Sequence, residues 1–247
     1  MEELEGYKKE LHLFNLRNIN VCALLLFFVT FVAGTLIFLF ATDCQFVLLN
    51  YIWLDIIIAI VFLVVGVIVH ELMHALMAIV VGKVKPKDIK LGVKLRDGIF
   101  YCNVSKPVTA GAYKVMLIVP IIVTGVIPWV ICAVFGNLFF IAAASLLIAG
   151  GASDVLMFSS LVKTDNKQLI MDHEDAAAYY LLVKETDVKE GFVEATPENE
   201  SELLKNMEAE NMKRDTKMIL VRLVLIAVFL AVIILGLFGI AKLMQFI

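Results

Sequence analysis

Long runs of apolar, nearly uncharged residues constrain this chain more than any other feature of its sequence. A helix needs about 20 such residues to cross the hydrocarbon core of a bilayer. Apolar residues make up 61% of the 247 positions and charged residues only 18%, which is more apolar surface than a soluble domain of this length can bury. We therefore predict an all-α membrane protein with about five transmembrane helices. The expected spans are 18–42, 52–82, 115–135, 137–162 and a fifth within 218–247.

The positively charged residues predict how these spans are oriented. Of the 21 Lys and Arg residues, all but Lys242 fall in the N-terminal segment, the loop after the second span, or the stretch from Lys163 to Arg222. Cytoplasmic loops of membrane proteins carry such an excess. We expect the N-terminus and these loops to be cytoplasmic and the C-terminus to lie outside. The polar N-terminal segment is not typical of a cleavable signal peptide.

The polar segments between the spans differ in pattern. Residues 87–105 alternate apolar and polar side chains around the turn pair Asp97-Gly98, which predicts a small cytoplasmic β-hairpin near the membrane surface. Such a hairpin can also be a mere connection between two spans. Residues 167–184 are expected to form a strand or helix. We assign 1–185 to a membrane-embedded core and 186–217, rich in Glu, Asn and Lys, to an acidic cytoplasmic linker.

One motif inside the second span carries chemistry. His70-Glu71-Leu72-Met73-His74 has the H-E-x-x-H spacing, which on a helix places two imidazoles on one face where they can bind one Zn²⁺. Glu71 can then act as general base toward a water. An ionisable residue at the centre of a span costs about 2.5–3.5 kcal/mol on insertion scales, so three of them in five positions indicate function. The alternatives are polar contacts between helices and a water-lined channel.

A zinc hydrolase needs a third protein ligand, and most candidates fail. The longer zincin pattern is absent, because Met77 and Val80 stand where it requires Gly and His. No Glu occurs between Glu71 and Glu174. Asp55 precedes the motif on the same helix by 15 residues, about 22 Å at 1.5 Å per residue.

Asp154 is the remaining candidate for the third ligand. It stands nine residues before Lys163, just as His74 stands nine residues before Lys83, so both side chains are expected at the same depth, in the inner leaflet. The small residues before Asp154 favour close approach of the fourth span to the second. The alternative is a carboxylate that packs helices or relays protons. His173 is the next candidate, although a histidine between two acids is usually a surface residue, as we also expect for His12.

These residues resemble a known group of proteins. A zincin motif near one end of a span and an Asp after small residues on a later span are similar to the site-2 protease clan. The stretches HELMHAL, KPKDIKLGVKLRDGIFYCNVSKPV, AYKVMLIVPIIV, GGASDVLM and DHEDAAAYYLLV more closely resemble a family of bacterial integral-membrane zincin peptidases. The resemblance implies that His70, His74 and Asp154 bind zinc and that Glu71 is the catalytic base. Site-2 proteases carry Leu-Asp-Gly at the third ligand; here Ser153 and Val155 flank the Asp, so the oxyanion-stabilising group is unassigned.

The sequence therefore predicts an intramembrane zinc metalloprotease whose partners are the lipid bilayer and a membrane-embedded or membrane-adjacent peptide substrate. The alternatives are a transporter or channel subunit and an inactive scaffold with a zinc site. No basic patch interleaved with aromatic residues is present, which argues against a nucleic-acid partner. The four cysteines lack metal-ligand spacing, and a disulfide between Cys44 and Cys132 is conceivable.

Overall fold

The computed structural model describes most of the chain before residue 207. The described ranges are 6–41, 51–94, 99–135, 138–174, 176–188 and 192–206. The chain divides into two compact units, Met1–Thr196 and Pro197–Ile247. The described part of the second unit is a helix over 197–206. The expected fifth span and residues 189–191 and 207–217 of the expected linker lie outside the described residues.

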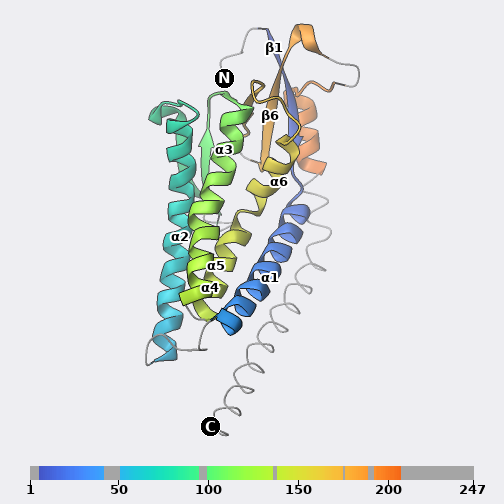
Figure 1. Cartoon of the computed structure of the whole chain (residues 1–247). Helices are drawn as coiled ribbons and strands as arrows, with labels where there is room; N and C mark the ends of the chain where they lie inside the picture. The colour runs from blue at the N-terminus through green and yellow to red at the C-terminus, as the bar shows by residue number, and fades with distance from the viewer. Residues whose placement is uncertain are drawn as a thin grey trace. The chain divides into compact units, whose positions relative to one another are not determined.

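The first unit is mostly helical, and its helices follow the apolar runs (Figure 1). The helical segments are α1 (Leu16–Ala41), α2 (Ile52–Val80), α3 (Ala110–Pro120), a π-helical segment η2 (Ile121–Val126), α4 (Ile127–Phe135), α5 (Leu138–Gly150) and α6 (Ala152–Leu161). Among the described residues, three helices are long and apolar enough to cross a membrane, and α5 with α6, bent by 43°, is a fourth if the pair is one span. This is compatible with a membrane protein.

Two glycines allow the helices to approach each other closely. A Cβ atom on Gly66 of α2 would lie 2.6 Å from a methyl of Leu147 on α5. A Cβ atom on Gly151, at the bend between α5 and α6, would lie 2.8 Å from Ile121. We expected the small residues before Asp154 to pack against the second span, but this glycine packs against the third; the close approach to the second span depends on Gly66 instead.

The prediction of an all-α protein is wrong, because four strands form an antiparallel sheet in the order β1-β6-β5-β4. The strands are β1 (Tyr7–Leu13), β4 (Val108–Thr109), β5 (Leu169–Asp172) and β6 (Ala178–Lys184). The sheet lies at the end of the bundle where α2 ends and α3 begins (Figure 1). The segments that we expected to share the cytoplasmic face therefore meet at one end, while the side of the membrane stays a prediction.

The hairpin expected over 87–105 is confirmed as β2 (Ile89–Lys94) and β3 (Ile99–Val104). Ile89 pairs with Val104 and Lys94 with Ile99; the turn pair Asp97-Gly98 lies outside the described residues. The hairpin does not lie flat at the end of the bundle. It runs beside the last turns of α2 (Figure 1), and the backbone N–H of Cys102 lies near the side chain of Glu71. This placement brings an edge of β3 next to the H-E-x-x-H motif on α2.

Candidate metal centre

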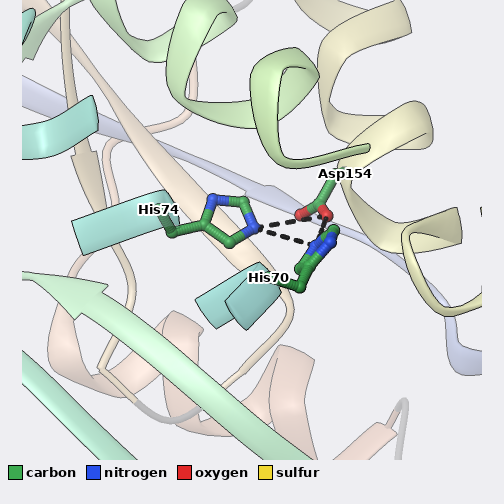
Figure 2. Close-up of side chains that lie close together, drawn as sticks. All are labelled: His70, His74 and Asp154. Carbon is green, nitrogen blue, oxygen red and sulfur yellow. Dashed lines mark hydrogen bonds and ion pairs between the residues drawn. The ribbon is translucent and has the colours of Figure 1, made fainter. Parts of the chain in front are cut away.

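Three side chains from two distant segments converge between α2 and α6 (Figure 2). Oδ2 of Asp154 lies 3.1 Å from Nε2 of His70 and 3.4 Å from Nε2 of His74. The two Nε2 atoms are 3.2 Å apart. The helical spacing of four residues puts both imidazoles on one face of α2, and the bend at Gly151 puts Asp154 in the first turn of α6. The structure thus brings Asp154 to both histidines of the motif, after the sequence had predicted equal depth for Asp154 and His74.

The donor set fits a zinc ion. Two donor atoms that each lie about 2.0–2.1 Å from a tetrahedral ion are separated by roughly 3.3 Å, and the three separations measured here are 3.1, 3.2 and 3.4 Å. Two imidazoles and a carboxylate are also the ligand types of catalytic zinc sites. The three side chains keep 11–14% of their surface exposed. The cluster is therefore largely shielded from solvent, but a small molecule such as water can still reach it. Among the described residues, this is the group of His, Cys, Asp or Glu side chains that can hold a metal.

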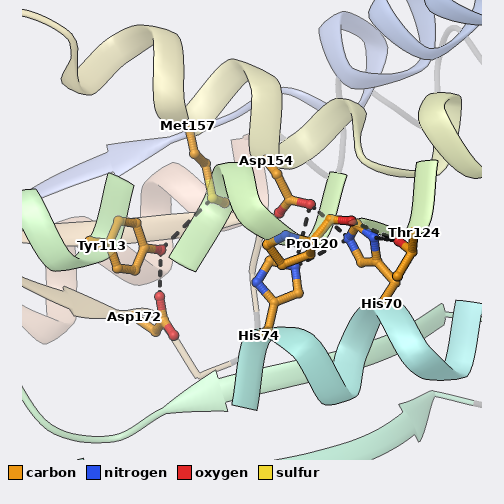
Figure 3. Close-up of polar contacts among 8 residues, drawn as sticks. All are labelled: His70, His74, Tyr113, Pro120, Thr124, Asp154, Met157 and Asp172. Carbon is orange, nitrogen blue, oxygen red and sulfur yellow. Dashed lines mark hydrogen bonds and ion pairs between the residues drawn. The ribbon is translucent and has the colours of Figure 1, made fainter. Parts of the chain in front are cut away.

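His70 has a second polar partner that the sequence analysis missed. Its Nδ1 lies 3.0 Å from the hydroxyl of Thr124, a buried residue of the π-helical segment. That hydroxyl donates a hydrogen bond of 2.8 Å to the backbone carbonyl of Pro120 (Figure 3). The available signal was a lone polar residue in an apolar span, four positions after a proline.

Glu71 lies beside the cluster and in contact with the hairpin. It follows His70 on α2, is partly buried, and accepts a hydrogen bond from the backbone N–H of Cys102 on β3. The carboxylate is therefore held next to the three candidate ligands without being one of them. A backbone donor of this kind leaves no trace in the residue types and was not predictable from the sequence.

A second, partly buried carboxylate connects the sheet to the hairpin. Asp172, on β5, accepts a hydrogen bond of 2.5 Å from the Tyr113 hydroxyl through Oδ1 and one of 2.9 Å from the Val104 N–H through Oδ2. Burial raises the pKa of Asp172, while these two hydrogen bonds act in the opposite direction. The Tyr113 hydroxyl also lies 3.9 Å from the sulfur of Met157, one turn beyond Asp154 (Figure 3). Asp172 thus fixes the strand that faces Glu71.

The other histidines have structural surroundings. His173, expected at the surface, is buried; its Nδ1 accepts a hydrogen bond from the Ala176 N–H, and its ring stacks on Tyr180. The His12 ring is half-buried rather than exposed and stacks on Tyr179 at 5.0 Å between centroids. Neither belongs to the candidate metal cluster.

Asp55 and the cysteines lie apart from the cluster. Asp55 is in the first turn of α2, as its distance along the helix requires, and is fully buried. Cys132 carries a free thiol, and its conceivable partner Cys44 lies outside the described residues. No disulfide to Cys132 therefore contributes to the fold described here.

The class of protein that this fold and site suggest is a metallopeptidase with helices long and apolar enough to cross a membrane. Residues 63–169 are similar to a family model described as "Putative zincin peptidase". The match covers less than half of the chain, but it includes all three candidate ligands and Glu71. No curated protein and no solved structure matches the chain. A zincin family implies zinc, in agreement with the donor set.

Proposed function

We propose that this chain is an integral-membrane zinc metallopeptidase that hydrolyses peptide bonds of a membrane-embedded or membrane-adjacent substrate. The observation that carries the proposal is the convergence of the two Nε2 atoms and the Asp154 carboxylate on one point, with Glu71 beside them. The similarity of residues 63–169 to zincin peptidases supports the same activity. We expect the site to lie in the inner leaflet, because the loops at that end of the spans carry most of the positive residues, and the motifs resemble those of the site-2 protease clan.

The roles follow from the donor chemistry of each residue. His70, His74 and Asp154 would hold the metal. When bound, zinc acts as a Lewis acid toward the scissile carbonyl and makes water acidic enough to attack near neutral pH. Glu71 accepts a proton from the attacking water as the new C–O bond forms, and delivers it to the leaving nitrogen as the C–N bond breaks. The Cys102 N–H holds the Glu71 carboxylate in place for both transfers.

The hairpin provides a place for the substrate. One edge of β3 pairs with β2, while the N–H groups of Cys102 and Val104 point away from β2, toward Glu71 and Asp172. A transmembrane helix must unwind before its carbonyls can be attacked, and the backbone groups that this frees need partners in a nonpolar medium. Because these two N–H groups of β3 already have partners, we propose that the unwound segment lies extended along the outer edge of β2 and pairs with it by strand addition.

The decisive experiment compares the purified wild type with Glu71→Gln in detergent. Zinc content is measured by mass spectrometry, and cleavage is measured on a library of synthetic transmembrane peptides. We expect one zinc per chain in both proteins and a loss of cleavage of about 10²–10⁴-fold in the variant, since Glu71 is the general base. The matched control is Glu174→Gln, an exposed carboxylate that pairs with Lys90, which should cleave as the wild type does.

Two other outcomes would refute the peptidase. Zinc bound by the wild type without cleavage of any peptide in the library indicates an inactive scaffold. Ion flux in proteoliposomes that depends on Glu71, without peptide cleavage, indicates a transporter or channel subunit.

A further inference from the structure

Thr124 is a polar residue in an apolar, tightly packed part of the third span. It belongs to the π-helical segment, in which the N–H of Ile127 bonds to the carbonyl of Ile122, five residues back. Single π-helical turns are rare and occur frequently at functional sites. The next residue, Gly125, is pressed against α5, where a Cβ atom would lie 2.9 Å from the side chain of Ile148 and 3.4 Å from its Cα. Thr124 is therefore held in place by its backbone.

The hydrogen bonds of Thr124 determine whether Thr124 or His70 is the donor in the contact between them. A threonine hydroxyl has one hydrogen and can accept through its lone pairs. The carbonyl of Pro120 cannot donate, so the hydrogen of the Thr124 hydroxyl is used in the 2.8 Å bond to that carbonyl. The 3.0 Å contact with Nδ1 of His70 must then be a bond that the imidazole N–H donates. The network assigns the proton of neutral His70 to Nδ1.

This assignment decides what His70 presents to the cluster. In a neutral imidazole one nitrogen carries hydrogen and the other an available lone pair. With the hydrogen on Nδ1, the lone pair is on Nε2, the atom that lies 3.1 Å from Asp154 and 3.2 Å from His74 (Figure 3). The other tautomer would direct a hydrogen at the place where a metal binds. Residues that fix a ligand histidine in this way typically contribute 10–100-fold to metal affinity.

We propose that Thr124 is a positioning residue of the metal centre, which holds His70 in the tautomer and ring orientation that binds metal through Nε2. The proposal rests on the proposed zinc site. It explains why a hydroxyl occurs at position 124 in an otherwise apolar segment. The π-helical segment η2 then serves to point that hydroxyl toward His70 on α2.

The test uses two substitutions at Thr124 and one matched control. Thr124→Val keeps the shape of the side chain and removes the hydroxyl, and Thr124→Ser restores it. The control is Thr30→Val, because Thr30 on α1 also donates to a carbonyl four residues back, Leu26, at 2.7 Å, without contacting a histidine. The full-length proteins are purified in detergent, and the zinc dissociation constant is measured by competition with a chromophoric chelator. The visible spectrum of the Co²⁺-loaded proteins reports ligand geometry.

We expect Thr124→Val to weaken zinc binding by about 10–100-fold and to change the Co²⁺ spectrum. Thr124→Ser and Thr30→Val should bind within about threefold of the wild type. Wild-type affinity in Thr124→Val, or an equal loss in Thr124→Ser, would overturn the proposal. A wild type that binds no zinc would refute the proposed metal centre instead, so the two failures can be told apart.

A second measurement needs no stable variant at Thr124. In the metal-free wild type labelled with nitrogen-15 in histidine, at a pH where imidazoles are neutral, the His70 signals should be those of the Nδ1–H form. His70→Asn identifies them by their loss. Signals of the Nε2–H form at His70 would contradict the proposal.

Discussion

Removing the Tyr113 hydroxyl should loosen the hairpin beside the candidate site while leaving the metal ligands untouched. Tyr113→Phe deletes the donor of the 2.5 Å hydrogen bond to Oδ1 of Asp172. Asp172 keeps its other bond, from the Val104 N–H, but one oxygen of this partly buried carboxyl group then has no protein donor. The strand that carries Val104 also carries Cys102, whose N–H holds Glu71. The perturbation therefore reaches the proposed base through two hydrogen bonds.

The expected magnitude follows from the kind of hydrogen bond that is lost. A bond to a charged group contributes about 1.5–3 kcal/mol. Tyr113 is buried and Asp172 is partly buried, so Tyr113→Phe should lower the free energy of unfolding by about that amount. Asp172→Asn should cost a comparable amount, because an amide has only one acceptor oxygen for two donors. The double variant should show a coupling energy of about 1–3 kcal/mol, since both changes remove the same contact.

Unfolding is followed by denaturant titration in detergent micelles at several pH values. The raised pKa of Asp172 means that its contribution to stability is complete below its unfolded pKa of about 4 and is lost as the pH rises through its native pKa; Asp172→Asn should remove this dependence. Zinc affinity should stay within about threefold of the wild type in both variants, whereas kcat falls. Additive effects of the two changes on unfolding, with an unchanged kcat, would show that the Tyr113–Asp172 contact does not hold the hairpin.

Three further predictions concern other parts of the structure. Asp154→Ala should lower zinc affinity by more than the roughly 10–100-fold typical of an outer-shell partner, measured by chelator competition; full retention moves the third ligand elsewhere. Burial and the nearby carboxylates raise the pKa of Cys102 to about 12. In metal-free protein its alkylation by iodoacetamide should therefore be about a thousandfold slower than that of an unperturbed thiol, as followed by mass spectrometry. Rapid alkylation would contradict this environment of the thiol. Gly66→Ala should destabilise the fold by about 1–3 kcal/mol through the clash with Leu147, whereas Gly150→Ala, with nothing within 4 Å of the new methyl, should change the unfolding free energy by less than about 0.5 kcal/mol; equal effects refute the packing argument.

The helices and the convergence of the three ligand candidates could be predicted because their signals are local. An apolar run long enough to span a bilayer has few alternatives to a helix. Counting residues from His74 and Asp154 to the next lysine gave their relative depth, and the structure places the two side chains 3.4 Å apart. The hairpin was also predictable from its alternating pattern.

The sheet and the supporting contacts could not be predicted because they depend on distant partners. The short segment Tyr7–Leu13 contains alternating side chains, but nothing local indicates that β6 would pair with it. Every residue type except proline would provide the same backbone N–H at position 102. The residue type therefore does not reveal that this N–H contacts Glu71. Asp172 begins the stretch DHEDAAAYYLLV, which carries part of the family resemblance. Only its contacts with Tyr113 and Val104 show that it connects the sheet to the hairpin.

The pairing of β1 with β6 has a consequence for biosynthesis. Tyr7 emerges from the ribosome long before its partner Lys184, and all the helices from α1 to α6 are made between them. The N-terminal strand must therefore wait, unpaired, until these helices have been made. Asp172 also follows all of these helices in the chain, so its hydrogen bond to Val104 of β3 can form only after they have been made. In the proposed peptidase, the hydrogen bonds that support the catalytic base would thus form only after the helices α1 to α6 have been synthesised.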